Sequence, residues 1–131
     1  EGANDPDCRR CMRWDPTELR MDIFQACRTL IALRRAHPAL RHGTWEPLMI
    51  FNGILAYRRQ CPGDDVLVIL NPRDAQPNVT IDLPSGEDRQ WRNRLSGDVY
   101  RATRGRLCLG HIPATTAMIL TPDENIHAHD Q

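Results

Sequence analysis

Lysine is absent from this sequence of 131 residues, so all 17 basic residues are arginines, and 17 acidic residues balance them. A balanced charge argues against a protein that binds nucleic acid mainly through the phosphates. Long apolar runs are also lacking, since a run such as Val66 to Leu70 is far shorter than the ~20 residues that cross a bilayer. With 40% hydrophobic and 26% charged residues, the composition predicts a folded domain without a membrane span.

The five cysteines cannot all pair with one another, which argues against a disulfide framework and favours a reducing, cytoplasmic compartment. Cys8 and Cys11 form a C-x-x-C pair, but no second pair or histidine pair follows at zinc-ligand spacing. We therefore expect no metal and no cofactor. The other three cysteines have apolar neighbours and are predicted to be small core residues: Cys27, Cys61 and Cys108. The acidic residues 1–7 show no signal peptide.

The clearest helix signal begins at Asp15, which is followed by Pro16 and, three positions on, by Glu18. An acid, a proline and a glutamate in this order are typical of a helix N-terminus. Apolar residues then recur with a helical period up to the proline at position 38, and the residue before a proline avoids the helical region. The pattern predicts one amphipathic helix over residues 16–36, with a face that must be buried. That face consists of Leu19, Ile23, Phe24, Ala26, Cys27, Leu30, Ile31 and Leu33.

After Gly43 the pattern changes to short apolar runs separated by turn residues, which predicts an all-β domain. Asn52-Gly53 stands between two such runs, and this pair favours a type I′ turn. Residues 48–59 are therefore predicted to form a hairpin. We expect strands over residues 48–51, 54–59, 66–71, 78–83, 90–95, 99–101, 106–109 and 117–121. Eight strands predict an antiparallel Greek-key β-sandwich.

The opening segment from Gly2 to Asp15, GANDPDCRRCMRWD, resembles a G-x-D-P-x-x-R-x-x-M-x-W stretch of α-amylase-family glycoside hydrolases, especially the neopullulanase, cyclomaltodextrinase and maltogenic amylase branch. In that family the stretch precedes the last helix of the catalytic (β/α)₈ barrel, and an antiparallel sandwich follows. The resemblance continues through LIALR at residues 30–34, HPALR at 37–41, LAYRR at 55–59 and LVILN at 67–71. It implies the end of a barrel over residues 1–43 and a C-terminal sandwich over 44–121. Residues 122–131 are polar and have no apolar periodicity, which predicts a frayed tail.

The resemblance also implies that the catalytic acids lie on barrel strands upstream of this segment. Retaining hydrolysis needs two carboxyl groups about 5 Å apart, and none of the acids present matches the family's pair. Asp64-Asp65 and Glu87-Asp88 are adjacent in turn-like sequence, where carboxylates usually stay solvated. The chain alone is therefore predicted to be inactive, without catalytic residues.

By the same resemblance, Asp5 and Arg9 match an aspartate and an arginine of the loop at the barrel mouth, which bind glucose hydroxyls. An ionised acid accepts hydrogen bonds from hydroxyls, and a guanidinium donates several while pairing with the acid. The alternative is an Asp–Arg pair that only fixes a loop. Trp14, Trp45 and Trp91 could stack on sugar rings, although packing is the favoured role because the chain has so few aromatic residues.

Three functional hypotheses follow. The first is the C-terminal part of an enzyme acting on α-1,4 or α-1,6 glucans or cyclodextrins, in which this piece completes and stabilises the missing barrel and contributes to the sugar-binding wall. The alternative is a stand-alone sandwich that binds carbohydrate or a protein. The third hypothesis is a metal or redox module on Cys8 and Cys11. A dimer formed through the exposed helix would also cover the apolar face of that helix.

His37, His42 and His111 have no acid at a readable spacing and are expected at the surface or at helix ends.

Overall fold

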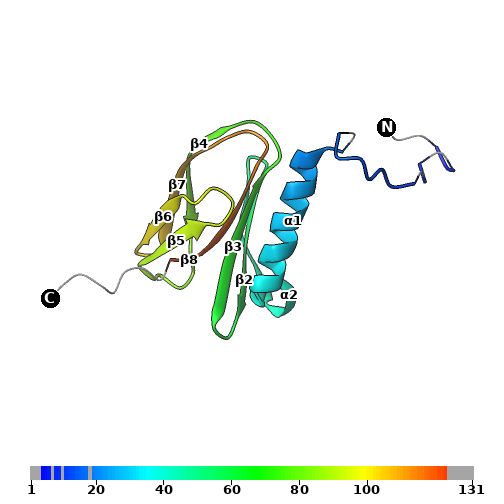
Figure 1. The fold of residues 1–131 in the computed structure, drawn as a ribbon. Helices are drawn as coiled ribbons and strands as arrows, with labels where there is room; N and C mark the ends of the chain where they lie inside the picture. The colour runs from blue at the N-terminus through cyan, green and yellow to red at the C-terminus, as the bar shows by residue number, and fades with distance from the viewer. Residues whose placement is uncertain (1–3, 7, 10, 18, 124–131) are drawn as a thin grey trace. The chain divides into compact units, whose positions relative to one another are not determined.

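The computed structural model describes residues 4–6, 8–9, 11–17 and 19–123, and these form two units, one within residues 1–32 and one over residues 33–131. The sandwich predicted for the second unit is confirmed. The elements are α1 (Met21–Ala36), α2 (Ala39–His42), β1 (Thr44–Phe51), β2 (Ile54–Cys61), β3 (Asp64–Asn71), β4 (Gln76–Asp82), β5 (Arg89–Asn93), β6 (Val99–Thr103), β7 (Arg106–Ile112) and β8 (Thr116–Pro122) (Figure 1).

The eight strands form one antiparallel sheet in the order β1-β2-β3-β8-β5-β6-β7-β4, which folds over until it is nearly closed. Strands β5, β6 and β7 are joined in succession and β4 pairs with β7, which is the Greek-key arrangement. Strand β8 lies between β3 and β5 and joins the two halves of the sheet. This position of β8 determines where the sheet can open.

The predicted hairpin is confirmed, with Phe51 opposite Ile54 and a turn in which both Asn52 and Gly53 have positive φ, at 49° and 82°. These are the torsions of a type I′ turn, whose twist suits two antiparallel strands. The register of β1 against β2 shifts between Pro47 and Met49, because a bulge inserts one extra residue into β1.

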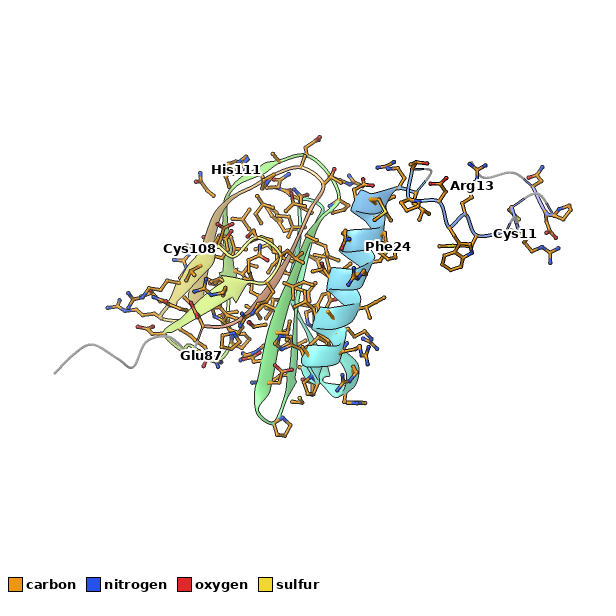
Figure 2. The ribbon with its side chains drawn as sticks, in the orientation of Figure 1. Cys11, Arg13, Phe24, Glu87, Cys108 and His111 are labelled. Carbon is orange, nitrogen blue, oxygen red and sulfur yellow. The ribbon has the colours of Figure 1, made fainter. Side chains whose placement is uncertain are left out.

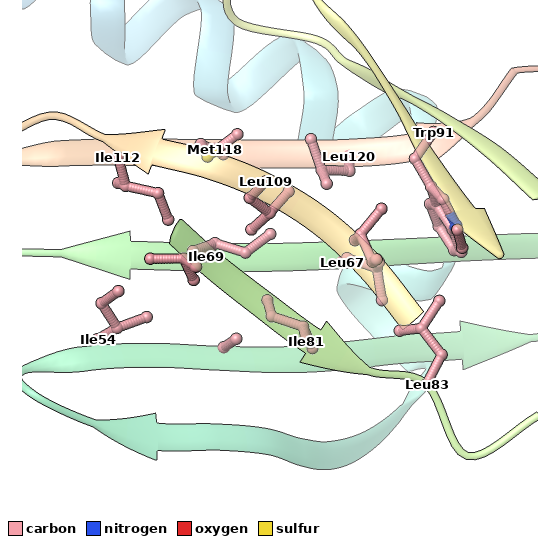
Figure 3. Close-up of a cluster of buried hydrophobic side chains, with 14 residues drawn as sticks. Ile54, Leu67, Ile69, Ile81, Leu83, Trp91, Leu109, Ile112, Met118 and Leu120 are labelled. Carbon is pink, nitrogen blue, oxygen red and sulfur yellow. The ribbon is translucent and has the colours of Figure 1, made fainter. Parts of the chain in front are cut away.

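The main core lies between the two halves of the sheet (Figure 3). Strand alternation sends every second side chain inward, so Leu67 and Ile69 of β3 meet Ile81 of β4 and Leu107 of β7 in this core. Trp91 of β5 is also buried there, fully shielded from solvent. This is the larger of the two apolar clusters, and each Å² of apolar surface that it buries contributes about 25 cal/mol to folding.

A second, smaller cluster covers the opposite face of β3 and is called the outer cluster here. Its buried members are Ala39, Val66, Val68 and Ile119, and its partly buried members are Leu33, Leu40, Tyr57, Cys61 and Leu70. Leu33 and Ala39 show that the last turn of α1 and the short helix α2 pack on the sheet as part of the second unit.

The predicted start of the helix was wrong, because α1 begins at Met21 rather than near position 16. The side chain of Asp15 accepts hydrogen bonds from the backbone N–H of Thr17 at 2.9 Å and from its hydroxyl at 2.7 Å. This local Asx turn replaces a helix cap, and Glu18 lies outside the described residues. The first helical bond is donated by Phe24 N–H to the carbonyl of Arg20. The end at Ala36 is confirmed.

No residue of α1 is fully buried, and its apolar side chains other than the partly buried Leu33 are open to solvent, with Ile23 53% and Ile31 58% exposed. Two cysteines predicted as core residues are also exposed, Cys27 on α1 and Cys108 on β7. Cys108 alternates with the inward-facing Leu107 and Leu109 and therefore points outward (Figure 2). Cys61 is half-buried. None of the described helices has the length and hydropathy that a membrane span requires.

Candidate functional site

The two residues that the sequence singled out for sugar binding, Asp5 and Arg9, lie together in the structure. Arg9 pairs with Asp5 through Nε at 2.6 Å and through a terminal nitrogen at 2.9 Å. Arg9 N–H also donates to the carbonyl of Pro6 at 2.9 Å, which closes the turn that places the two side chains side by side. Both side chains are exposed, 72% for Arg9 and 65% for Asp5.

The side chains of Asp5 and Arg9 keep hydrogen-bonding groups that their own ion pair does not use. The Asp5 carboxylate accepts two bonds from Arg9 and a long contact from the Cys8 thiol at 3.9 Å, out of about four lone-pair sites, and a guanidinium has five N–H donors. An ion pair this exposed adds little to stability, about 1 kcal/mol or less. The geometry therefore presents a fixed array of donors and acceptors to the solvent, which is what recognition of vicinal hydroxyls requires.

The three tryptophans have different environments. Trp91 is a core residue, as favoured, with the guanidinium of Arg89 5.3 Å from its ring. Trp45 is 56% exposed, and its ring centre lies 6.0 Å from that of Tyr57 at an interplanar angle of 37°. Trp14 is 79% exposed. Packing in the core is therefore wrong for Trp14 and Trp45, whose indole faces remain accessible.

Histidine and cysteine side chains do not gather into a metal centre. Among the described residues there is no group of three His, Cys, Asp or Glu side chains able to hold an ion. Cys8 and Cys11 are exposed. His37 has an acid partner 27 positions away, which the sequence spacing did not reveal: His37 Nδ1 lies 2.9 Å from Asp64 Oδ1, and the Ala39 N–H donates to the other oxygen of Asp64 at 2.9 Å.

The acid pairs are also less solvated than expected, and Asp65 is buried. Arg58, itself buried, donates to Asp65 through Nε at 2.9 Å and to Glu87 through a terminal nitrogen at 3.1 Å. Arg89 donates to Asp65 at 3.2 Å. These contacts raise the pKa of Arg58, chiefly through its hydrogen bonds with Asp65, and its charge is retained.

The hydrogen bond from the Ser85 hydroxyl, assisted by the nearby arginines, lowers the pKa of Glu87 despite its partial burial. Glu87 is thus held ionised by its hydrogen bonds and by the neighbouring arginines. A catalytic acid of a retaining hydrolase needs a raised pKa, so this cluster has the wrong electrostatics for catalysis.

Sequence reasoning missed the Arg58–Asp65 pair and the His37–Asp64 pair. Both join residues that the sequence separates, by 7 positions in one case and 27 in the other. The one readable signal was the position of Arg58 in an alternating strand, at an inward-facing site between Ala56 and Gln60. A buried arginine requires a buried acid.

Comparison with known proteins agrees with this architecture. Residues 50–114 match the family model of the maltogenic amylase C-terminal domain. A cyclomaltodextrinase of Geobacillus thermopakistaniensis is 31% identical over 117 residues, which is 86% of this chain and 19% of that protein. Neopullulanase 2 of Thermoactinomyces vulgaris is 32% identical over 111 residues, 82% of this chain and 19% of that protein. An α-amylase of Anoxybacillus superposes with a TM-score of 0.83 at 25% identity, covering 97% of this chain and 27% of its own.

The class defined by the fold is thus the C-terminal β-domain of α-amylase-family enzymes. Within that class, the chain belongs to the maltogenic amylase C-terminal domain family and is similar to cyclomaltodextrinases and neopullulanases. It spans about a fifth of the length of these two relatives.

Proposed function

We propose that this chain serves an enzyme acting on α-1,4-linked glucans or cyclodextrins, in which it completes the catalytic barrel and supplies one polar contact to the sugar. The observation that carries the proposal is the exposed two-point pair of Asp5 and Arg9. It lies in the segment that resembles the family's barrel-mouth loop. The carboxylate would accept hydrogen bonds from two hydroxyls of one glucose, and the guanidinium would donate to a neighbouring oxygen.

The barrel-completing role is supported by α1. Its apolar side chains, including Phe24, Leu30 and Ile31, are open to solvent within this chain. A stripe of this size is costly to leave uncovered, because burying one large apolar side chain contributes roughly 1.5 to 3 kcal/mol. The missing barrel is the surface that would cover it. A cytoplasmic location remains a prediction from the unpaired cysteines.

The experiment is a titration of the ¹⁵N-labelled 131-residue chain with maltotriose, followed by NMR at the amides of residues 4–9 and at the Nε of Arg9. We expect concentration-dependent shifts that Asp5→Asn and Arg9→Lys abolish. Arg20 and Asp22 form a second exposed pair, joined at 3.1 and 2.6 Å, so Arg20→Lys is the matched control and should leave the shifts intact. Titration curves that are identical in all three variants would refute the sugar contact.

A second candidate is a sandwich that binds carbohydrate on its own, and the exposed Trp45, whose ring lies beside that of the half-buried Tyr57, favours it. Two tilted aromatic faces can stack on successive pyranose rings. In the same titration this candidate predicts a shift of the Trp45 indole N–H that is lost in Tyr57→Ala. In either case we expect the purified chain to release no reducing sugar from starch or cyclodextrin.

A further inference from the structure

The sheet opens where β8 stops pairing with β3, and a cleft lies at this opening. β3 pairs with β8 from Leu67–Leu120 to Asn71–Thr116. Beyond Leu120, β8 follows β5 instead, with Thr121 opposite Arg92 and Pro122 opposite Trp91. The first residues of β3 therefore pair with β2 alone among the described strands.

The cleft lies in the second unit and has a volume of about 670 Å³, within the range of about 300–1,000 Å³ typical of small-molecule sites. The β2–β3 hairpin forms one wall and β5 with the end of β8 forms the other. Its polar lining consists of His37, Gln60, Asp64, Asp65, Arg89, Arg92, Arg94, Thr121 and Asp123.

Every carboxylate in the cleft already has a cation or a donor. Asp65 accepts from Arg58 and Arg89, and Asp123 accepts from a terminal nitrogen of Arg92 at 2.7 Å. Asp64 is held by His37 and by a backbone N–H, as described above. These contacts hold the three carboxyl groups in place, and a carboxylate has about four lone-pair sites, so each can still accept a hydrogen bond from a ligand.

Other groups of the lining retain free hydrogen-bonding capacity. Arg94 donates through Nε to the buried hydroxyl of Thr121 at 2.6 Å. Its two terminal nitrogens have no hydrogen-bond partner within the described part of the chain, and the same holds for the side-chain amide of Gln60. The bond to Thr121 fixes the direction of the guanidinium, so little conformational entropy is lost when a ligand binds.

The charges of the cleft decide the class of ligand. Three arginines and three aspartates line it, so their formal charges cancel. An anion would gain from Arg94, but Arg89 and Arg92 are already paired with aspartates, so the lining has no excess positive charge to attract it. A neutral molecule with many hydroxyls can donate to the aspartates and accept from Arg94 and Gln60.

We infer that this cleft, between the start of β3 and the end of β8, is a binding site for a short neutral oligosaccharide. The choice of an α-glucan as that oligosaccharide rests on the proposed function. The site differs from the Asp5–Arg9 pair in residues, and from the Trp45–Tyr57 pair in chemistry, because its lining binds by hydrogen bonds and not by stacking.

The test is the maltotriose titration of the full 131-residue chain, read at the amides of Gln60, Cys61 and Thr121 and at the Nε of Arg94. We expect saturable shifts at concentrations up to about 10 mM. Arg94→Ala and Gln60→Ala should each weaken binding about tenfold, the worth of one well-placed hydrogen bond. Arg101→Ala is the matched control, since Arg101 is an exposed arginine of β6 outside the cleft.

Two further measurements separate the ligand classes and the two proposals. Arg94→Lys keeps the charge but loses the planar fork, so sugar binding should not recover, and inorganic phosphate should not shift the cleft signals. Phosphate binding that Arg94→Lys retains would overturn the inference. Maltotriose shifts at Asp5 and Arg9 alone would refute the cleft and support the proposed loop contact, whereas shifts at the cleft alone would refute that contact and support the cleft.

Discussion

Asp64 shows how one residue can link two elements through its charge. Burial alone would raise the pKa of Asp64, but hydrogen bonds from His37 and from the Ala39 N–H outweigh burial and hold its pKa below the ordinary value. A carboxyl whose pKa is lower in the folded than in the unfolded chain stabilises the fold above its unfolded pKa, near 4, and loses this effect as the pH falls through the folded pKa.

We therefore predict that Asp64→Asn lowers the free energy of unfolding by about 1 kcal/mol at pH 7 and that the difference from the parent chain shrinks below about pH 4. Urea unfolding at several pH values measures both quantities. Asp82→Asn is the control, because the Asp82 side chain is 85% exposed and should show no such dependence. A difference that stays constant down to pH 3 would show that the carboxylate charge is not involved.

At the residue scale, the sequence predicted partners that are close along the chain better than partners that are distant. The Asp5–Arg9 pair spans four positions and formed as a pair, although its contact with sugar stays a prediction. His37 and Asp64 are brought together only by the packing of α2 on the sheet. A single sequence contains no local pattern that would reveal such a pair.

At the element scale, the β6–β7 turn depends on a glycine for two separate reasons. Gly105 has a φ of +73°, and a Cβ at this position would lie 2.8 Å from the Leu83 carbonyl oxygen and 2.8 Å from the Cα of Gly86. Gly63, in the β2–β3 turn, has a φ of +80° but no atom within 4 Å of such a Cβ. An alanine would thus be strained by the positive φ at both positions, but only at position 105 would its Cβ clash with other backbone atoms.

Gly63→Ala should therefore cost about 1 kcal/mol, the penalty of the left-handed conformation, while Gly105→Ala should cost about 2 kcal/mol more because backbone atoms must move. Thermal and urea unfolding of the two variants give the comparison directly. Equal losses would mean that the backbone near Leu83 relaxes freely, which would contradict the tight packing of this turn.

Local turn sequences explain which helices and strands could be predicted from the sequence. All eight strands were expected, because turn residues such as Asn52-Gly53 determine where chains reverse, but β1 begins at Thr44, four residues before its predicted start. The start of α1 was not predicted correctly, since Asp15 forms a local turn with Thr17 instead of capping a helix. The helix α2 had no apolar period to reveal it, being only four residues long.

At the scale of the whole molecule, the family and the sandwich were predicted from the order of short sequence motifs along the chain, each of which is weak by itself. The comparisons with known proteins confirm both predictions. The opening between β3 and β8 could not be predicted, because it depends on which strand β8 follows at each position. Strand pairing over a long sequence separation leaves no mark on either segment alone.

The division into two units leads to a prediction about neighbouring residues of one helix. Leu33 packs in the outer cluster of the second unit, whereas Leu30, one turn earlier, is 45% exposed. Replacement by alanine preserves helix propensity at both positions, so the comparison isolates burial. Leu33→Ala should lower the free energy of unfolding of the sandwich by about 1 to 2 kcal/mol, and Leu30→Ala by less than about 0.5 kcal/mol.

Urea unfolding followed by Trp91 fluorescence reports the sandwich, since Trp91 lies in its core. Hydrogen exchange adds a second measurement, in which the amides of residues 21–32 should exchange well before those of residues 45–120 because no residue of α1 is buried. Equal destabilisation by the two variants, with equal protection of both regions, would mean that the apolar stripe of α1 already has a partner in this chain or in a second copy. The need for a missing barrel would then disappear, and the stand-alone carbohydrate-binding function would become the better supported one.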